Sequence, residues 1–252
     1  MNSKEYFHKR KRLVVNEESF IGAGSQWEVF RIKLKDCDLN DKSMIYKKSI
    51  NMNSYSYQHN LQIYKHIKNA GLRTLEFYDS GKVDDLDAIF AQDLNTESRF
   101  YVSPNSARKK GNFQEKLINS LLQGKEYDEY EGVPEAEKLL LQNKLEEVNN
   151  LEETMLLIHD QMEIATANNI CTCADAFFFG LDQSKKIITD IVIADFDNIH
   201  KSRIDKRKKS CNEIEMLNSL WEFIDNFVKD LSAKEYKSII EEIIIKLQED
   251  IA

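Results

Sequence analysis

Short apolar runs separated by polar turns make up most of the first part of the chain. Residues 58–69 depart from this pattern, because their apolar side chains recur at helical spacing and Gly71 follows them as a helix-ending glycine would. The remaining apolar runs predict four strands, at residues 29–34, 43–50, 75–78 and 88–92. The first two are separated by the polar stretch KDCDLND, and this favours a hairpin.

From about residue 112 onward the spacing of apolar residues is mainly helical. Behind Pro134, one apolar stripe runs from Leu141 to Met162 and predicts a single long helix. The runs AFFFGL and IITDIVIA, separated by DQSKK, interrupt the helical pattern and favour a buried hairpin. Helical spacing returns in the tail from Leu217. The whole pattern predicts an α+β protein, β-rich first and helical later.

Composition narrows the class of protein. The chain has 252 residues, with 42% hydrophobic and 31% charged residues, which is typical of a folded domain or of two lobes. No apolar run approaches the ~18 residues of a membrane span, and the start MNSKEYFHKRKRL lacks the apolar stretch of a secretion signal. The four cysteines do not form the pattern of a disulfide framework. We therefore expect a cytoplasmic protein without a membrane span.

Charge is unevenly distributed along the chain. The net charge of −8 does not favour nucleic acid as a partner. Residues 4–12 are basic, residues 126–153 are strongly acidic, and KSRIDKRKK at 201–209 forms a second basic run. On an acidic protein, this second run would attract an acidic or phosphorylated acceptor or partner protein. A solvated surface loop is the alternative interpretation.

Two segments of the β-rich part suit phosphate binding. In IGAGSQWEVF, the backbone N–H groups of Gly22, Ala23, Gly24 and Ser25 can surround a phosphate, although a plain hairpin turn has the same composition. In MIYKK, a rigid strand carries Lys47 and can place its ammonium on phosphate oxygens. Exposed lysines on strands are common, so neither segment is specific alone.

Two later segments offer carboxylates. In CADAFFFGL, Asp175 lies just before the first strand of the predicted hairpin, where it can accept a proton from a hydroxyl nucleophile or cap a turn. In IVIADFD, Asp195 ends the second strand and Asp197 follows it, so their oxygens suit Mg²⁺. An ordinary strand-end aspartate is the alternative. The cysteines and histidines show no metal-ligand spacing.

Taken in this order, the four segments resemble the protein kinase-like fold over roughly residues 14–230. GAGSQWEV resembles the Gly-rich loop of that family, MIYK its third-strand lysine motif, CADAFFFGL its catalytic loop and ADFD its Asp-Phe-Gly motif. AQDLN, with Gln92 and Leu94, falls where the family has the hinge between its lobes. The chain has no Ala-Pro-Glu segment, and in this respect it resembles the atypical and small-molecule kinases more than the eukaryotic-type protein kinases.

The resemblance implies a two-lobed α+β architecture and a nucleotide site. Its parts are a basic N-terminal extension (1–13), an N-lobe with an antiparallel sheet and one helix (14–93), and a mostly helical C-lobe (94–252). It implies ATP bound by the residues of the glycine loop, the hinge residues and Lys47. It also implies Mg²⁺ on Asp195, helped by Asp197, and an acceptor hydroxyl oriented or deprotonated by Asp175.

The departures from the family pattern leave two functions open. Trp27 stands in place of the third glycine, and the helix that should supply a glutamate to the strand lysine offers His59, Asn60 or Gln62. Gly180 stands where the catalytic-loop asparagine would hold a second Mg²⁺. The retained lysine and aspartates favour an ATP-Mg²⁺-dependent phosphotransferase. The losses favour a pseudokinase that binds nucleotide or partner proteins without transferring phosphate.

Overall fold

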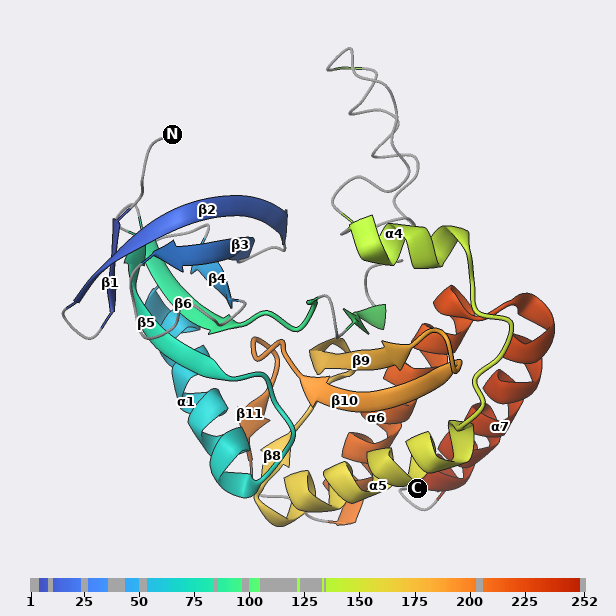
Figure 1. Ribbon diagram of the computed structural model, residues 1–252. Coiled ribbons are helices and arrows are strands. Elements are labelled where there is room, and N and C mark those ends of the chain that lie inside the picture. Colours follow the sequence, from blue (N-terminus) through green and yellow to red (C-terminus); the bar gives the residue numbers. More distant parts are fainter. Residues whose placement is uncertain are drawn as a thin grey trace.

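The computed structural model shows an α+β protein, as the sequence predicts (Figure 1). An antiparallel sheet and one helix occupy the N-terminal part, and a central hairpin surrounded by helices occupies the C-terminal part. The structure describes residues 5–8, 11–23, 27–35, 44–49, 54–83, 86–96, 100–104, 122, 133, 135–202 and 206–249. Within this part of the chain, no helix combines the length and the apolar composition needed to cross a bilayer.

The N-terminal sheet has six strands in the order β1-β2-β3-β4-β6-β5, and every neighbouring pair is antiparallel. The strands are β1 (Glu5–His8), β2 (Lys11–Ala23), β3 (Trp27–Lys35), β4 (Met44–Ser49), β5 (Phe77–Val83) and β6 (Leu86–Gln92). The predicted β3–β4 hairpin is confirmed. Residues 1–13, which we expected as an extension, supply β1 and the start of β2.

The strand predicted at residues 75–78 begins later, at Phe77, and continues to Val83. The backbone just before it is engaged elsewhere. Thr74 forms a bridge with Ile193, and the N–H of Leu75 donates to the carbonyl of Ile193 at 3.4 Å. Leu75 is therefore buried, as its apolar character requires, in a cluster that joins Ala91 of the N-terminal sheet to Val192 of the C-terminal hairpin.

Side-chain alternation gives the N-terminal sheet two distinct faces. On one face, the ring of Tyr46 lies between those of Phe30 and Phe90, with centroids 5.0 and 5.9 Å away. Because successive side chains on a strand point to opposite faces, Trp27 on β3 and Lys47 on β4 share the other face. This second face carries the sequence-predicted strand lysine.

The predicted N-terminal helix is confirmed as α1 (Ser54–Ala70). Gly71 ends it with φ of 83°, a left-handed conformation that glycine adopts without steric cost. The N–H of Gly71 donates to the carbonyl of Lys68 (3.1 Å), and the N–H of Leu72 donates to that of Ile67 (3.2 Å). These two bonds form a Schellman motif, which satisfies carbonyls at the end of the helix.

The C-terminal part contains four helices and two small antiparallel sheets among the described residues. The helices are α4 (Glu135–Gln142), α5 (Leu151–Ala167), α6 (Lys206–Phe227) and α7 (Asp230–Glu249). One sheet, in the order β10-β9-β7, joins β7 (Tyr101–Val102), β9 (Phe177–Asp182) and β10 (Ile187–Ile193), and the other pairs β8 (Ile170–Cys171) with β11 (His200–Lys201). The β9–β10 pair confirms the predicted buried hairpin.

The single long helix predicted behind Pro134 is wrong, and the proline itself lies outside the described residues. The chain leaves the helical path after α4 and re-enters it at α5. Between them, Leu145 exchanges backbone hydrogen bonds of 2.8 Å with Phe227 and Lys229, at the end of α6. Leu145 is buried there, so its apolar character is satisfied by a crossing segment and not by a continuous helix face. Apolar spacing alone cannot distinguish these two arrangements.

Candidate functional site

The turn after β10 carries Asp195 and Asp197 on either side of a buried phenylalanine. Phe196 is fully buried, and its ring meets those of Phe77 and Tyr64 edge-on, at centroid distances of 5.2 and 6.2 Å. This packing fixes the turn against β5 and α1. The two neighbouring carboxylates remain partly buried.

Asp175 lies in the short 3₁₀ turn η2 (Ala174–Ala176), directly before β9. Two side chains of α6 hold the chain just ahead of it. Asn212, only 2% exposed, accepts from the N–H of Thr172 (2.9 Å) and donates to the carbonyl of Ile170 (2.8 Å). Glu215, one helical turn later, accepts from the N–H of Ala174 at 3.0 Å. The position of Asp175 is therefore set by α6.

Sequence reasoning missed Asn212 and Glu215. A signal was present for the first, because Asn212 falls on the same helical stripe as the buried residues Met216 and Leu220. A polar residue on an apolar face usually has a hydrogen-bonding partner inside the protein. Here that partner is the segment leading to Asp175.

Asp175 and Asp195 lie near one another although they are on separate segments. The carbonyl of Ala176 accepts from the N–H of Ala194 (2.9 Å) and from that of Asp195 (3.3 Å). Both carboxylates act electrostatically on the thiol of Cys173. Burial, and then the negative charges of Asp175 and Asp195, raise the pKa of Cys173 to about 12.

Cys173 should consequently resist alkylation in the folded protein. Because the thiolate is the reactive form, a pKa of about 12 leaves roughly one thiol in 10⁴ reactive at pH 8. We expect iodoacetamide at pH 8 to modify the exposed Cys211 first, and the rate at Cys173 to rise with pH until the thiol titrates. Mass spectrometry of the peptides measures both rates. Equal modification of the two cysteines at pH 8 would contradict this arrangement.

Lys47 reaches the same region from the N-terminal sheet. Its ammonium donates a hydrogen bond of 3.2 Å to the carbonyl of Ala194, the residue directly before Asp195. The structure therefore brings together Lys47, Asp175 and Asp195, which the sequence predicted as one site. An ammonium and two carboxylates lie where the sheet meets the β9–β10 hairpin.

Asp197 is bound by N–H donors from two elements of the N-terminal part. The indole N–H of Trp27 lies 3.2 Å from each carboxylate oxygen, and the side-chain amide of Asn60 donates to one oxygen at 2.7 Å. Asn60 is one of the three residues expected near the strand lysine, and its amide here binds the aspartate. The carboxylate of Asp195 accepts the backbone N–H of Asp197 at 3.4 Å.

The chemistry of these oxygens fits a hard cation at Asp195. At Asp197, the same cation would compete with the N–H groups of Trp27 and Asn60 for carboxylate oxygens. Among the described residues, no group of three or more His, Cys, Asp or Glu side chains is arranged to hold a metal ion.

The glycine segment is described only in part. Gly22 and Ala23 belong to β2, where they pair with Val29 and Glu28 of β3 after a shift in register. Gly24 and Ser25 lie outside the described residues.

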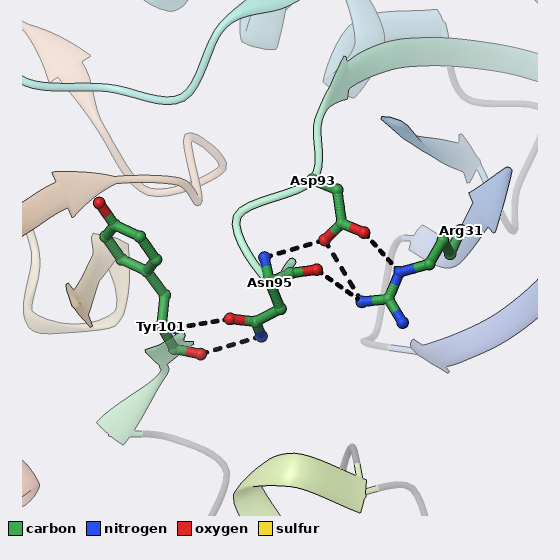
Figure 2. Close-up of polar contacts among 4 residues, drawn as sticks. All are labelled: Arg31, Asp93, Asn95 and Tyr101. Atoms are coloured by element: carbon green, nitrogen blue, oxygen red, sulfur yellow. Dashed lines mark hydrogen bonds and ion pairs between the residues drawn. The ribbon is translucent and has the colours of Figure 1, made fainter. Parts of the chain in front are cut away.

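The segment after β6 connects the N-terminal sheet to the C-terminal part through a polar network (Figure 2). Asp93 is 2% exposed, and both of its oxygens accept from the guanidinium of Arg31 on β3. Asn95 donates its N–H to Asp93 (2.9 Å), and its side chain bonds both the N–H and the carbonyl of Tyr101. The network links β3 to β7, so it fixes how this connecting segment runs.

Gln92 and Leu94, the predicted hinge residues, flank this network. The N–H of Gln92 donates to the carbonyl of Glu76 (2.7 Å), and its side-chain oxygen accepts the N–H of Glu76 (3.2 Å). Leu94 is buried in a cluster with Val192 and Ala194, next to the turn that carries Asp195. Leu94 thus adjoins the candidate site, while Gln92 is bound to Glu76, the residue directly before β5.

Gly180, where the resemblance expects an asparagine, lies in the middle of β9 with no room for a side chain. A Cβ atom there would be 2.9 Å from a ring carbon of Tyr101 and 3.0 Å from the hydroxyl of Thr189. The glycine therefore permits the close approach of β7 and β10 to β9.

No protein-family model matches this chain, and no curated protein matches it either. The arrangement of the side chains is therefore what indicates a function. Its centre is the meeting of Lys47, Asp175 and Asp195, supported by Asn212 and Glu215 from α6.

Proposed function

We propose that this protein is an ATP- and Mg²⁺-dependent phosphotransferase of protein kinase-like fold that acts on a hydroxyl acceptor. One observation carries the proposal. Lys47, Asp175 and Asp195 come from separate segments, and the backbone joins them: Lys47 donates to the carbonyl of Ala194, directly before Asp195, and the N–H of Asp195 donates to the carbonyl of Ala176, directly after Asp175. A cation opposite two carboxylates is the charge arrangement that phosphoryl transfer requires, because the reaction depends mainly on positioning and electrostatic stabilisation.

Each residue has a distinct role in this proposal. The ammonium of Lys47 and the backbone of residues 22–25 bind phosphate oxygens, and the segment around Gln92 and Leu94 lies along the nucleotide base. Asp195 holds Mg²⁺, with Asp197 beside it. When bound, Mg²⁺ neutralises charge on the phosphates, and it commonly takes one or two carboxylates together with phosphate oxygens and water. Asp175 orients or deprotonates the acceptor hydroxyl.

The charge pattern supports an acidic or phosphorylated acceptor or partner protein. The basic run at 201–209 follows the turn that carries Asp195, on a protein of net charge −8. Within this run, the structure describes Lys201 as exposed on β11. Local positive charge beside the site would favour the approach of a negatively charged acceptor.

A second candidate function, a pseudokinase, is favoured by Gly180. Any side chain there would meet the ring of Tyr101, so this position cannot supply the asparagine that would hold a second Mg²⁺ in the active members of the family. In this alternative the protein binds nucleotide or a partner protein without transferring phosphate. If the protein binds nucleotide, turnover separates the two candidates.

Mg-ATP is expected to stabilise the folded protein. At about 100 times its dissociation constant, a ligand that binds only the folded state adds about 2.7 kcal/mol, which raises the melting temperature by several degrees. Lys47→Ala and Asp195→Ala should each reduce this shift, because they remove a phosphate contact and the metal ligand. Thermal unfolding with ATP, with and without Mg²⁺, measures the effect.

Lys48→Ala is the matched control for this experiment. Lys48 is the next residue on β4, but it points to the opposite face, where it pairs with Glu28 at 3.2 Å. Its removal should leave the ATP shift unchanged. A wild-type protein whose melting temperature does not respond to saturating Mg-ATP would exclude the nucleotide site and the phosphotransferase.

A further inference from the structure

Trp27 extends from the start of β3 to a carboxylate of the turn after β10. It is the first residue of β3 and shares a sheet face with Lys47. Its side chain is buried, with the residue only 4% exposed, and its indole N–H lies 3.2 Å from both oxygens of Asp197. The indole therefore reaches from the sheet to within two residues of Asp195.

This position conflicts with a bound phosphate chain. Under the proposed function, phosphates lie against the pair Lys47 and Asp195. Trp27 shares a sheet face with Lys47, and its side chain extends to the turn that carries Asp195. A flexible glycine at this position would leave the space open, whereas a buried indole fills it.

The contact is also strong enough to matter for binding. Its acceptor is a carboxylate, and hydrogen bonds to charged groups are stronger than those between neutral groups. Asn60, fully buried on α1, holds the same carboxylate from another direction at 2.7 Å. Asp197 is thus fixed as an acceptor for the indole, and opening the contact exposes a buried ring and separates a charge-assisted pair.

We propose that Trp27 is a gate over the phosphate end of the nucleotide site, closed by its hydrogen bond to Asp197. Nucleotide phosphates enter only when this bond breaks and the indole moves away. The inference rests on the proposed nucleotide binding and adds a specificity to it. The gate weakens the binding of ATP, whose phosphates need this space. It does not weaken the binding of adenosine, which has no phosphates.

Replacement of the indole tests the gate by ligand affinity. In Trp27→Phe, ATP should bind roughly tenfold to a hundredfold more tightly than in the wild type, because a bond to a charged group no longer has to break. Adenosine affinity should change less than about twofold, because it lacks phosphates to displace the gate. Equilibrium dialysis with Mg-ATP and with adenosine measures both affinities.

Trp221→Phe is the matched control. Its indole N–H also donates to a carboxylate, that of Glu241, at 2.9 Å, but this pair lies on the surface between α6 and α7. The variant loses the same kind of bond at a surface position. Its ATP affinity should therefore equal that of the wild type.

The control variant also provides a second measurement that does not depend on the folding of Trp27→Phe. The chain has two tryptophans, so Trp27 is the single indole left in Trp221→Phe. Its fluorescence should change as Mg-ATP is added, in proportion to the ATP bound in dialysis, and should stay constant with adenosine.

The outcomes separate the gate from the proposed function. Tighter ATP binding by Trp27→Phe together with an ATP-dependent change in Trp27 fluorescence supports the gate. If ATP binds with equal or lower affinity to Trp27→Phe and the fluorescence stays constant, the gate is wrong while nucleotide binding stands. Failure of both proteins to bind ATP or adenosine overturns the gate and the proposed function together.

Discussion

Asp175→Asn should slow phosphoryl transfer by about 10²–10⁴-fold while leaving ATP affinity nearly unchanged. The substitution keeps the size of the side chain and removes its capacity to accept a proton from the acceptor hydroxyl. The turn that carries Asp175 is held through backbone groups by Asn212 and Glu215, so the loop should keep its conformation. Single-turnover ATP hydrolysis or transfer, with ATP binding measured separately, tests the expectation.

Asp160→Asn provides a control with the same change of charge. Asp160 is exposed on α5, away from the turn of Asp175, so both turnover and binding should match the wild type. If wild-type protein binds Mg-ATP yet shows no turnover with water or any acceptor, the phosphotransferase is wrong and the pseudokinase is supported. If Asp175→Asn keeps full turnover, Asp175 is not the proton acceptor.

Local pattern in the sequence was sufficient to predict the α+β class and most of its elements. Alternation and turn composition identified the β3–β4 and β9–β10 hairpins, and Gly71 marked the end of α1. These features are determined by neighbouring residues, so the chain itself contains the information. The prediction of one long helix is wrong because local pattern does not identify distant partners. The stripe through Leu145 correctly reported burial but could not identify α6 as the element that covers it.

The candidate site was predicted only in part, because several of its contacts join residues that are far apart in the sequence. Lys47 and Asp195 were chosen by type and order, and Lys47 contacts the carbonyl of Ala194, the residue directly before Asp195. The indole of Trp27 and its acceptor Asp197 could not be paired in advance, since no local pattern relates a strand residue to a turn 170 positions later. The sequence showed Trp27 only as the residue in place of the third glycine, and its hydrogen bond to Asp197 makes it a candidate gate.

Gly180→Asn should destabilise the protein without creating a second metal site. Its Cβ would lie 2.9 Å from the ring of Tyr101, and this ring is not free to swing away. The backbone of Tyr101 is bonded on both sides by Asn95, and its hydroxyl donates to Asp190 at 3.2 Å. Inserting a side chain into such packing costs typically about 1–3 kcal/mol. Urea unfolding measures the loss of stability, and the Mg²⁺ dependence of ATP binding shows whether a second metal site has formed.

Two further variants assign the cause of this loss. Gly180→Ala adds the Cβ without the amide, so it should already show most of the destabilisation. In a Tyr101→Leu background the ring is gone, and the same Gly180→Ala change should cost less than in the wild type, because coupled neighbours are not additive. If Gly180→Asn were as stable as the wild type and bound ATP with a stronger dependence on Mg²⁺, β9 would accommodate the asparagine. The absence of that side chain would then no longer favour the pseudokinase.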